Sequence, residues 1–573
     1  MLLPLIISTA IGVAPFARAY LVNSSDYSSG ALGAAPVQTF KTVNWTAAEW
    51  NFNVYPSADL PSGYLFLAPR GSDVETPTGI IYTNDGEVVM HGKEFGIGQT
   101  MSFSVGTYQS NQVIATWGGQ FYGNGYGNGF GLIYDQNYNL IANISSTISG
   151  SGIDFHEFVL TDKDTVLATV YIKEQYDLSS WNVTTEDGTS GWILGGAFEE
   201  IDVATGEALF SWKSLDHIDP RECYNDPGST GVAESSAWDY FHINSIEKDL
   251  EGNYLVSSRH CHAVYQISAS TGEVLWTING RNSSFNMGRG TNFEWQHDAR
   301  WINNYTQISI FDNAASSWES DERMARGLLL NVDTDAMSIT LAHEYLPWNQ
   351  TVSPSQGSMQ EQTNGNYILG WGQIPFFSEY SSDGTLLSSA QFGVGNVQGY
   401  RALRSNWTGY PRTTPALTVI SNSTTDQYDI YTSWNGATEI SFWVLYGATS
   451  LSGSASNSKL NQVDKTKFET YFSLSKDTAA SYPWVQARAV SSNGTVLGYS
   501  DYVSLNGSGS VTASSTQASA TEATSAAATS SRGAASTSSA TNNPISGAAK
   551  LRAGLGFVIA AVSAVLLLRD SGR

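Results

Sequence analysis

The chain has 573 residues, of which 41% are hydrophobic and 12% aromatic, a composition typical of folded globular proteins and unlike that of disordered ones. Its 52 acidic residues outnumber its 28 basic residues and give a formal net charge of −24 at pH 7. Such a charge repels phosphates, so it excludes a nucleic-acid partner.

The N-terminus is predicted to be a signal peptide over residues 1–19. An apolar run occupies residues 2–13, and Ala17, Arg18 and Ala19 fit the small-residue pattern of a cleavage site. The rest of the chain is rich in Asn-x-Ser/Thr sequons, which indicates a glycosylated protein of the secretory pathway. The sequons begin at Asn23, Asn44, Asn143, Asn182, Asn282, Asn304, Asn349, Asn406, Asn422, Asn493 and Asn506.

One hairpin pattern recurs six times. Each copy has an apolar strand, a turn rich in Asp, Asn or Gly, and a second apolar strand, and the copies start roughly 50 to 65 residues apart. They cover residues 79–90, 131–141, 198–210, 264–276, 328–341 and 376–387. This spacing suits a four-stranded blade, so we expect an all-β fold whose main domain, residues 37–407, is a six-bladed β-propeller.

A further pair of strands precedes four of these hairpins. Its first strand carries a histidine near the start in three copies, at His156, His242 and His297, and begins at Ser358 in the fourth. If these are the innermost strands of successive blades, their equivalent positions face one axial channel. We therefore expect the first residues of these strands to converge there.

A glycine-rich run at residues 123–129 imitates a phosphate-binding loop. Asn-Gly pairs between strands are typical of hairpin turns, and no helix pattern follows this run to supply a dipole. We interpret it as a turn.

The chain has two cysteines, Cys223 and Cys261. In an oxidising compartment they are predicted to form a disulfide. Two unpaired, buried thiols are the alternative.

Beyond the propeller, alternating strands at residues 428–434, 439–446 and 484–490 predict a small β-sandwich over residues 415–505. This region resembles a fibronectin type III domain. It has no clustered histidines, cysteines or paired carboxylates, so we interpret it as a spacer or packing domain.

The C-terminal part is predicted to be a stalk and an anchor. Residues 507–546 are almost entirely Ser, Thr, Ala and Gly, which is typical of a disordered, O-glycosylated stalk. The apolar run at residues 553–568 is shorter than the ~20 residues that a spanning helix prefers. It is either a GPI-attachment signal or a single transmembrane helix. Both place the globular part outside the cell, at the surface or wall, with membrane contact only through this end.

Several motifs follow one another in the propeller region. They are Asp239-x-x-His242-x-Asn244-Ser245, Arg259-His260-Cys261-His262, Gln296-His297-Asp298-Ala299-Arg300, Asp312-Asn313 and Arg326-Gly327. In this order they resemble the arylsulfotransferase family, specifically its secreted, fungal-type branch, over residues 61–393. The resemblance implies a propeller channel that moves a sulfuryl group between phenols through a transiently sulfated histidine, without a nucleotide sulfate donor.

The same resemblance implies catalytic roles for His242, His297 and Arg326. A neutral imidazole can attack sulfur and form a covalent intermediate, and a second imidazole can move the phenol proton. An arginine can hold the sulfuryl oxygens. The family's third histidine has no counterpart where Gln360 stands, so we expect the nucleophile to be His242 or His297.

Neighbouring residues are expected to contact the substrate. They are Asn244, Arg259, His260, Asn313 and Gln360. Arg259 and Arg300 could instead form salt bridges, and His260 and His262, as alternate residues of one segment, could form a metal pair. Because the spacing fixes no third ligand, we expect no metal and no other cofactor.

The leading hypothesis is a monomeric aryl sulfotransferase that acts on small phenolic or aryl sulfate substrates. A noncatalytic cell-surface propeller that binds a glycan or a protein is the alternative.

Overall fold

The computed structural model describes residues 20–511 apart from 124, 184, 186–189, 317–323, 350, 452–456 and 506–509. The predicted signal peptide and anchor lie outside the described residues, as does the predicted stalk except for residues 510–511. In the described part of the chain, no helix is both long and apolar enough to span a membrane.

The fold is all-β. The α-helices among the described residues are α1 (Ser25–Ser28) and α2 (Lys476–Ser481). The short 3-10 helices are Gly92–Phe95, Ser179–Trp181, Ser214–Asp216, Pro220–Glu222 and Glu234–Ser236.

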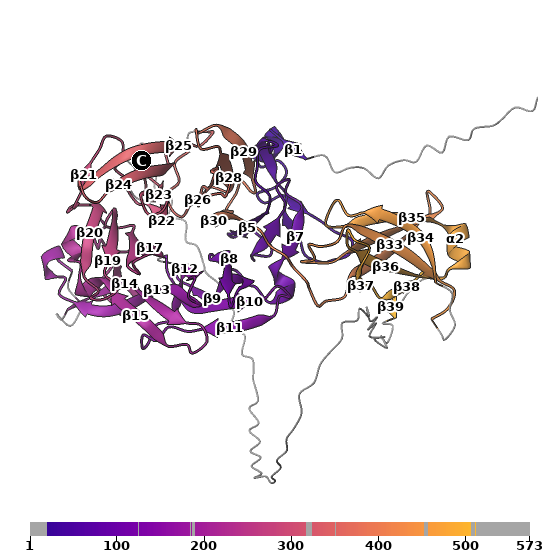
Figure 1. Cartoon of the computed structure of the whole chain (residues 1–573), viewed down its shortest axis with the longest axis horizontal. Helices are drawn as coiled ribbons and strands as arrows, with labels where there is room; N and C mark the ends of the chain where they lie inside the picture. Colours follow the sequence, from indigo (N-terminus) through magenta and orange to yellow (C-terminus); the bar gives the residue numbers. More distant parts are fainter. Residues whose placement is uncertain are drawn as a thin grey trace, which may run out of the picture. The chain divides into compact units, whose positions relative to one another are not determined.

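Six antiparallel units of four strands follow one another through the first 405 residues (Figure 1). The first three units, each written from its inner to its outer strand, are β30 (Gln398–Ser405), β5 (Tyr64–Arg70), β6 (Ile80–Tyr82), β7 (Val88–His91); β8 (Phe103–Tyr108), β9 (Asn111–Phe121), β10 (Gly127–Tyr134), β11 (Leu140–Ile144); and β12 (Ile153–Leu160), β13 (Thr165–Tyr176), β14 (Gly191–Asp202), β15 (Ala208–Lys213).

The next three are β17 (Ile243–Lys248), β18 (Tyr254–Ser258), β19 (Ala263–Ile267), β20 (Val274–Asn279); β22 (His297–Ile302), β23 (Gln307–Asp312), β24 (Arg326–Asp333), β25 (Ser338–Tyr345); and β26 (Ser358–Glu361), β27 (Tyr367–Gly370), β28 (Phe376–Tyr380), β29 (Leu386–Gln391). Short strands add to these units or pair nearby: β1 (Leu21–Val22), β2 (Val37–Gln38), β3 (Ala47–Ala48), β4 (Asn51–Val54), β16 (Trp238–Asp239) and β21 (Asn286–Met287). The last two strands of each unit include the six hairpins that the sequence predicts.

The inner strands of the six units contact one another in a closed order. β8 contacts β12, β12 contacts β17, and the series continues through β22, β26 and β30 back to β8. β30 comes from the C-terminal end of this region, yet it pairs with β5 from its N-terminal end. The first unit is therefore completed by the last strand.

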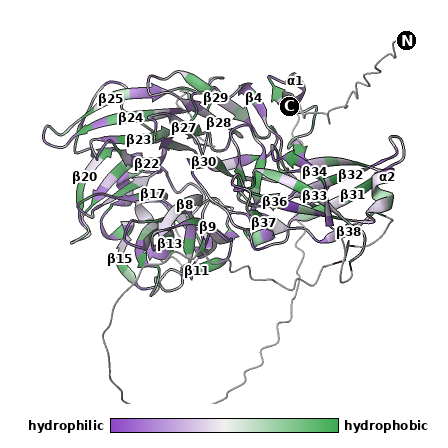
Figure 2. Ribbon diagram, turned by 45° about the vertical axis from the view of Figure 1, so that its right-hand side comes forward, coloured by the Kyte–Doolittle hydropathy of each residue, from purple (hydrophilic) through white to green (hydrophobic). Residues whose placement is uncertain are grey.

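Inner strands are buried and outer strands alternate. The first four residues of inner strand β17 are buried, whereas along β25 buried or partly buried residues alternate with exposed ones. Figure 2 shows hydrophilic and hydrophobic residues following one another along the strands. Such alternation is expected where a strand covers a core with one face only.

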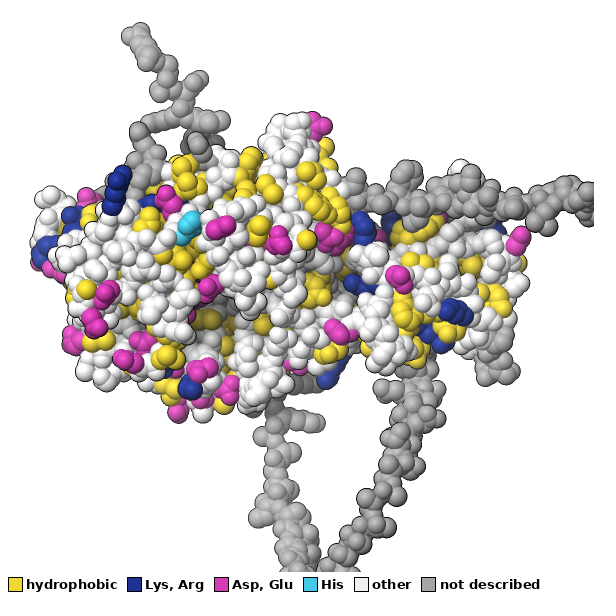
Figure 3. All heavy atoms as spheres, turned by 45° about the horizontal axis from the view of Figure 1, so that its top comes forward, with side chains coloured by type: hydrophobic (Ala, Val, Ile, Leu, Met, Phe, Trp, Pro, Cys, Tyr) yellow, Lys and Arg dark blue, Asp and Glu magenta, His cyan; other side chains and the backbone are white. Residues whose placement is uncertain are grey.

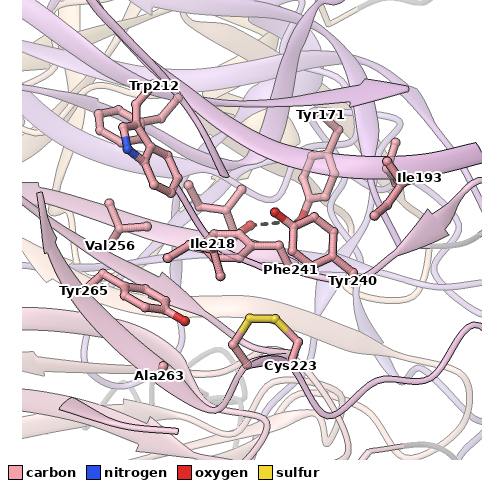
Figure 4. Packing of buried hydrophobic residues seen from close by; sticks show 14 of the residues in the cluster. Tyr171, Ile193, Trp212, Ile218, Cys223, Tyr240, Phe241, Val256, Ala263 and Tyr265 are labelled. Carbon is pink, nitrogen blue, oxygen red and sulfur yellow. Dashed lines mark hydrogen bonds between the residues drawn. A yellow bond between two sulfur atoms is a disulfide. The ribbon is translucent and has the colours of Figure 1, made fainter. Parts of the chain in front are cut away.

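Aromatic side chains pack between neighbouring units. Trp117, Trp212 and Trp371 are at most 2% exposed, in agreement with a packing role. Cys223 and Cys261 form the predicted disulfide, which Figure 4 shows beside Phe241, Tyr240 and Tyr265. The alternative of two free thiols is thereby excluded.

Residues after 415 form two further sheets. One contains β31 (Ala416–Asn422), β32 (Gln427–Ser433) and β35 (Thr470–Ser475); the other contains β34 (Asn457–Asp464), β33 (Phe442–Ala448), β36 (Trp484–Val490), β37 (Val496–Tyr499), β38 (Tyr502–Ser504) and β39 (Ser510–Val511). Both sheets contribute to one core, with Trp443 and Phe472 at its centre. The three strands predicted here correspond to β32, β33 and β36.

Candidate active site

Four histidines gather where the inner strands of neighbouring units begin. His156 lies in β12, His242 directly precedes β17, His297 opens β22 and His260 follows β18. The ring of His242 lies 4.8 Å from that of His156, 4.6 Å from that of His260 and 6.5 Å from that of His297, between centroids. All four are between 2% and 7% exposed.

Irregular backbone accompanies these histidines. The ladders that join β12, β17 and β22 to their second strands shift register at the histidine-bearing segments. His242 also has a positive φ of 54°. A bulge re-aims the side chains beside it, and here one lies within or next to each histidine-bearing segment.

His242 forms a pair with Asp239. Its ring Nδ1–H donates to Asp239 Oδ2 at 2.5 Å, and its backbone N–H donates to Asp239 Oδ1 at 3.1 Å. Burial lowers the pKa of His242, although the Asp239 carboxylate acts in the opposite direction. Nε2 of this neutral ring has no hydrogen-bond partner among the described residues, so its lone pair is available.

His156 forms a second pair of the same kind. Its Nδ1 lies 2.5 Å from Asp154 Oδ1, and Asp154 is fixed by the backbone N–H of Gly127 at 2.6 Å and by the hydroxyl of Thr169 at 3.1 Å. Nε2 of His156 likewise lacks a partner in the described parts of the chain. Two Asp-oriented imidazoles thus stand side by side, 4.8 Å apart and nearly perpendicular.

His297 differs because both of its ring nitrogens are occupied. Nδ1–H donates to Asn313 Oδ1 at 2.7 Å, and Nε2 accepts the backbone N–H of Gln356 at 3.2 Å. The amide of Asn313 is held in this orientation by the carbonyls of Ser353 and Gln356. Burial, followed by the charge of Arg259, keeps the pKa of His297 well below its usual value.

His260 connects the histidines to an arginine. Its Nδ1–H donates to the backbone carbonyl of Asp239 at 2.7 Å, while its Nε2 accepts from Arg259 Nη1 at 2.9 Å. Burial keeps the pKa of His260 well below its usual value and lowers that of Arg259 to about 10. Arg259 also donates to the carbonyl of Pro354 at 2.9 Å and lies over the ring of Trp295. It is a buried cation within the histidine cluster.

The disulfide holds this region from one side. Next to Cys223, the backbone N–H of Tyr224 donates to the carbonyl of His260 at 2.7 Å. Asn225 donates to the carbonyl of Asp239 at 2.8 Å. Asp239, which bonds His242, and His260, which bonds Arg259, are therefore both hydrogen-bonded to the segment that the disulfide anchors.

The structure does not bring every predicted residue to the cluster. Arg326 bonds Asp312 at 3.0 Å, Glu344 at 2.9 Å and the carbonyl of Asn292 at 2.9 Å, and among the described residues it contacts none of the four histidines. Gln360 accepts the backbone N–H of Arg404 and donates to its carbonyl.

Other predicted residues have structural roles. Asn244 donates to the carbonyl of Gln296 and so joins β17 to the segment before β22. Arg300 takes the salt-bridge alternative, because it pairs with Glu157 at 2.5 Å and with Asp298 at 2.8 Å. Arg401 pairs with the same two carboxylates.

A metal ion fits this site less well than an anion. Asp239, His242 and His260 could converge on an ion, since their ligand atoms lie within 4.8 Å of one another. The permanent charge of Arg259 directly beside His260 opposes a cation and favours an anion. The ring of His262 stacks on Tyr224 instead, with centroids 4.2 Å apart. The face of the molecule that Figure 3 shows carries scattered acidic side chains.

Sequence reasoning assigned no role to Asp154, Asp239 or Gln356. Two of these had a local signal, because Asp154 and Asp239 stand two and three residues before a candidate histidine. The contact of Gln356 with His297 joins distant segments and had no such signal.

Comparisons with known proteins identify one family. The arylsulfotransferase (ASST) family profile matches residues 106–393. No curated protein matches the chain.

Solved structures resemble the chain only distantly. A protein of unknown function from Bacteroides caccae is 13% identical, with a TM-score of 0.35, and the match covers 60% of this chain and 99% of that one. The extracellular domain of the putative hybrid two component system BT3049 from B. thetaiotaomicron is 10% identical, with a TM-score of 0.32, and covers 81% of this chain and 56% of its own. A luciferin-regenerating enzyme is 11% identical, with a TM-score of 0.25 and coverage of 48% and 82%.

Proposed function

Because the chain belongs to the arylsulfotransferase family, we propose that it transfers a sulfuryl group from a phenolic sulfate ester to a phenol through a sulfated histidine. The observation that carries this proposal is the pair of Asp-oriented imidazoles, His242 and His156, beside the buried cation Arg259.

We assign the nucleophile to His242. Its Nε2 has no partner among the described residues and its lowered pKa keeps it neutral near pH 7, whereas Nε2 of His297 already accepts a hydrogen bond. In the first step Nε2 attacks sulfur, a nitrogen–sulfur bond forms, and the sulfur–oxygen bond to the aryl group breaks. His297 then acts as a positioning residue.

The second imidazole, His156, handles the proton. Oriented by Asp154, it gives a proton to the leaving phenolate. As a neutral ring it then takes the proton of the acceptor phenol, whose oxygen attacks sulfur and releases His242. His156 thus regains in the second step the proton that it gave in the first, and His242 is released, so the reaction needs no cofactor.

Arg259 is proposed to hold the sulfuryl oxygens, in place of Arg326. Charge on these oxygens is stabilised best by a cation inside a water-poor site. Arg259 lies beside His260 within the buried histidine cluster, whereas Arg326 contacts none of the four histidines among the described residues.

We also infer that the six units are the blades of a β-propeller. The closed order of contacts between inner strands and the pairing of β30 with β5 support this arrangement. The two later sheets would then be a fibronectin type III-like spacer. The disulfide supports an extracellular location, and we propose a monomer at the cell surface that acts on small aryl sulfates.

Release of a chromogenic phenol from an aryl sulfate, with phenol as acceptor, tests the proposal. We expect His242→Ala to reduce turnover at least ~100-fold. After brief exposure to donor and an alkaline quench, mass spectrometry should find sulfate on His242 in the wild type and in His297→Ala. Undiminished turnover of His242→Ala would refute the mechanism. Absence of any turnover by the wild type would favour the alternative, a noncatalytic cell-surface propeller that binds a glycan or a protein.

A further inference from the structure

Two arginines occupy related positions in different units of the repeat. Arg70 is the last residue of β5, the second strand of its unit, and Arg259 directly follows β18, the second strand of another. Arg70 pairs with Gln398, the first residue of inner strand β30, and the backbone N–H of Arg259 bonds to His242, just before inner strand β17. Both side chains therefore start from the same end of the inner strands as the histidines.

The two guanidinium groups bind the same short segment from opposite ends. Arg259 Nη2 donates to the carbonyl of Pro354 at 2.9 Å, and Arg70 Nη2 donates to Oε1 of Gln356 at 2.8 Å. Gln356 is itself the residue whose backbone N–H reaches His297 Nε2. Arg70 is thus one residue removed from the histidine cluster.

Gln356 is held in an unusual conformation. It is 6% exposed and has a φ of 63°, in the left-handed region that few non-glycine residues adopt. Its side chain is fixed between Arg70 and Gln398, to whose Oε1 it donates at 3.0 Å. Such strain persists where the surroundings demand it, often beside functional groups.

Arg70 lacks the carboxylate partner that four other arginines near the inner strands have. Arg300, Arg401, Arg404 and Arg326 each pair with a carboxylate. Among the described residues Arg70 has no carboxylate partner, and its buried Nε has no hydrogen-bond acceptor. Burial lowers its pKa to about 10, so it is still a cation near pH 7. A partly buried cation without an anion is costly, and a bound anion would remove that cost.

We infer that Arg70 binds a second anionic group of the substrate, separate from the sulfuryl group at Arg259. This inference rests on the proposed function and narrows its substrate class to aryl sulfates and phenols that carry an additional carboxylate or sulfate. The phenolic oxygen would face His242 and His156, and the second anion would lie across the Pro354–Gln356 segment.

Binding of two isosteric phenols tests the inference without any turnover. 4-Hydroxybenzoate carries the second anion and 4-hydroxybenzamide is its neutral counterpart, and calorimetry can measure both. We expect the wild type to bind 4-hydroxybenzoate at least about tenfold more tightly than 4-hydroxybenzamide, because a hydrogen bond between charged groups contributes about that much affinity. Arg70→Gln should remove this preference while affinity for the amide is unchanged, and Arg70→Lys should retain part of it.

Arg221→Gln, which removes an exposed arginine on a surface ion pair, is the matched control and should bind like the wild type. Equal affinity of the wild type for the two phenols would overturn the inference, even if Arg70→Gln failed to fold. An equal loss of affinity for both phenols in a folded Arg70→Gln variant would also overturn the inference, because a purely structural role of Arg70 predicts that result. Because no readout requires sulfuryl transfer, a preference for the carboxylate in an inactive protein would separate this inference from the proposed reaction.

Discussion

At the scale of single residues, the four histidines differ in the hydrogen bonding of their Nε2 atoms. The rings of His242 and His156 are oriented by a carboxylate at Nδ1, and their Nε2 atoms are unbonded within the described chain. His297 and His260 have both nitrogens engaged. The first two can therefore exchange a group or a proton without first breaking a hydrogen bond.

Replacing Asp239 tests this distinction. In Asp239→Asn the amide can donate to Nδ1 and favours the tautomer whose lone pair is turned away from the substrate. By analogy with other carboxylate–histidine pairs, we expect kcat to fall by roughly 10²- to 10⁴-fold while the fold is retained. Asp162→Asn, at an exposed ion pair with Lys163, is the control for loss of a carboxylate. Normal turnover of Asp239→Asn would remove His242 from the nucleophile position.

The two candidate arginines give opposite expectations. Arg259→Gln should lower kcat by about 10²- to 10³-fold, as loss of an oxyanion-stabilising donor does elsewhere. Arg326→Gln should retain turnover and lower the free energy of unfolding instead, because it removes an ion pair with the buried carboxylate of Asp312. Steady-state kinetics and denaturant unfolding of both variants decide between them, and the reverse pattern would restore Arg326 to the site.

The residues that sequence reasoning found and missed differ in the range of their contacts. The proximity of His242 and His297 could be predicted because a repeat places them at equivalent strand starts. The sequence alone could not distinguish Arg259 from Arg326, because Glu344, a partner of Arg326, lies 18 residues further along the chain. Gln360 was expected at the channel, but the residue that contacts His297 is Gln356, through its backbone N–H, before β26 begins. A turn through positive φ, which no period-2 pattern encodes, separates the two positions.

At the scale of elements, local patterns predicted the fold well. All six hairpins lie where apolar runs flank Asp, Asn or Gly turns, since turn and strand chemistry are local. The bulges at the inner strands, and the order in which units pair, depend on contacts far apart in sequence and were not predictable in detail.

The disulfide is the element-scale feature with the clearest consequence for stability. It closes a loop of 38 residues in sequence separation and fixes the segment that bonds His260 and Asp239. We expect the double variant Cys223→Ala, Cys261→Ala to lose roughly 2–4 kcal/mol of unfolding free energy. Chemical denaturation of the oxidised wild type and the double variant measures this difference. Identical midpoints would show that packing alone holds the segment.

At the scale of the whole molecule, a buried ionic cluster joins inner strands of several units. Glu157, Asp298, Arg300 and Arg401 come from β12, β22 and β30. Glu247 of β17 lies beside them and accepts the backbone N–H of Trp301. Burial raises the pKa of Glu247 from 4.5 to about 7. The protonation of this carboxyl thus depends on groups from neighbouring units, since Arg300, Asp298 and Glu157 come from β22 and β12.

This raised pKa predicts a pH dependence of stability. Between pH 4.5 and pH 7 the folded protein holds a proton on Glu247 that the unfolded chain has released, so this group's contribution to stability is lost as the pH rises through that window. In Glu247→Gln the free energy of unfolding should fall less than in the wild type across this pH window, by on the order of 2 kcal/mol. Denaturant unfolding at several pH values measures it, with Glu251→Gln as a control. Parallel pH profiles of Glu247→Gln and the wild type would contradict the assignment.

The pairing of β30 with β5 has a consequence for biosynthesis. A ribosome releases β5 more than 300 residues before it releases β30, as their bounds show. Throughout that interval β5 has an unpaired edge, which is a template for association with other chains. A nascent or truncated chain that ends before Gln398 would therefore need protection by chaperones, and premature termination anywhere in the later units would yield aggregating products, not partly active ones.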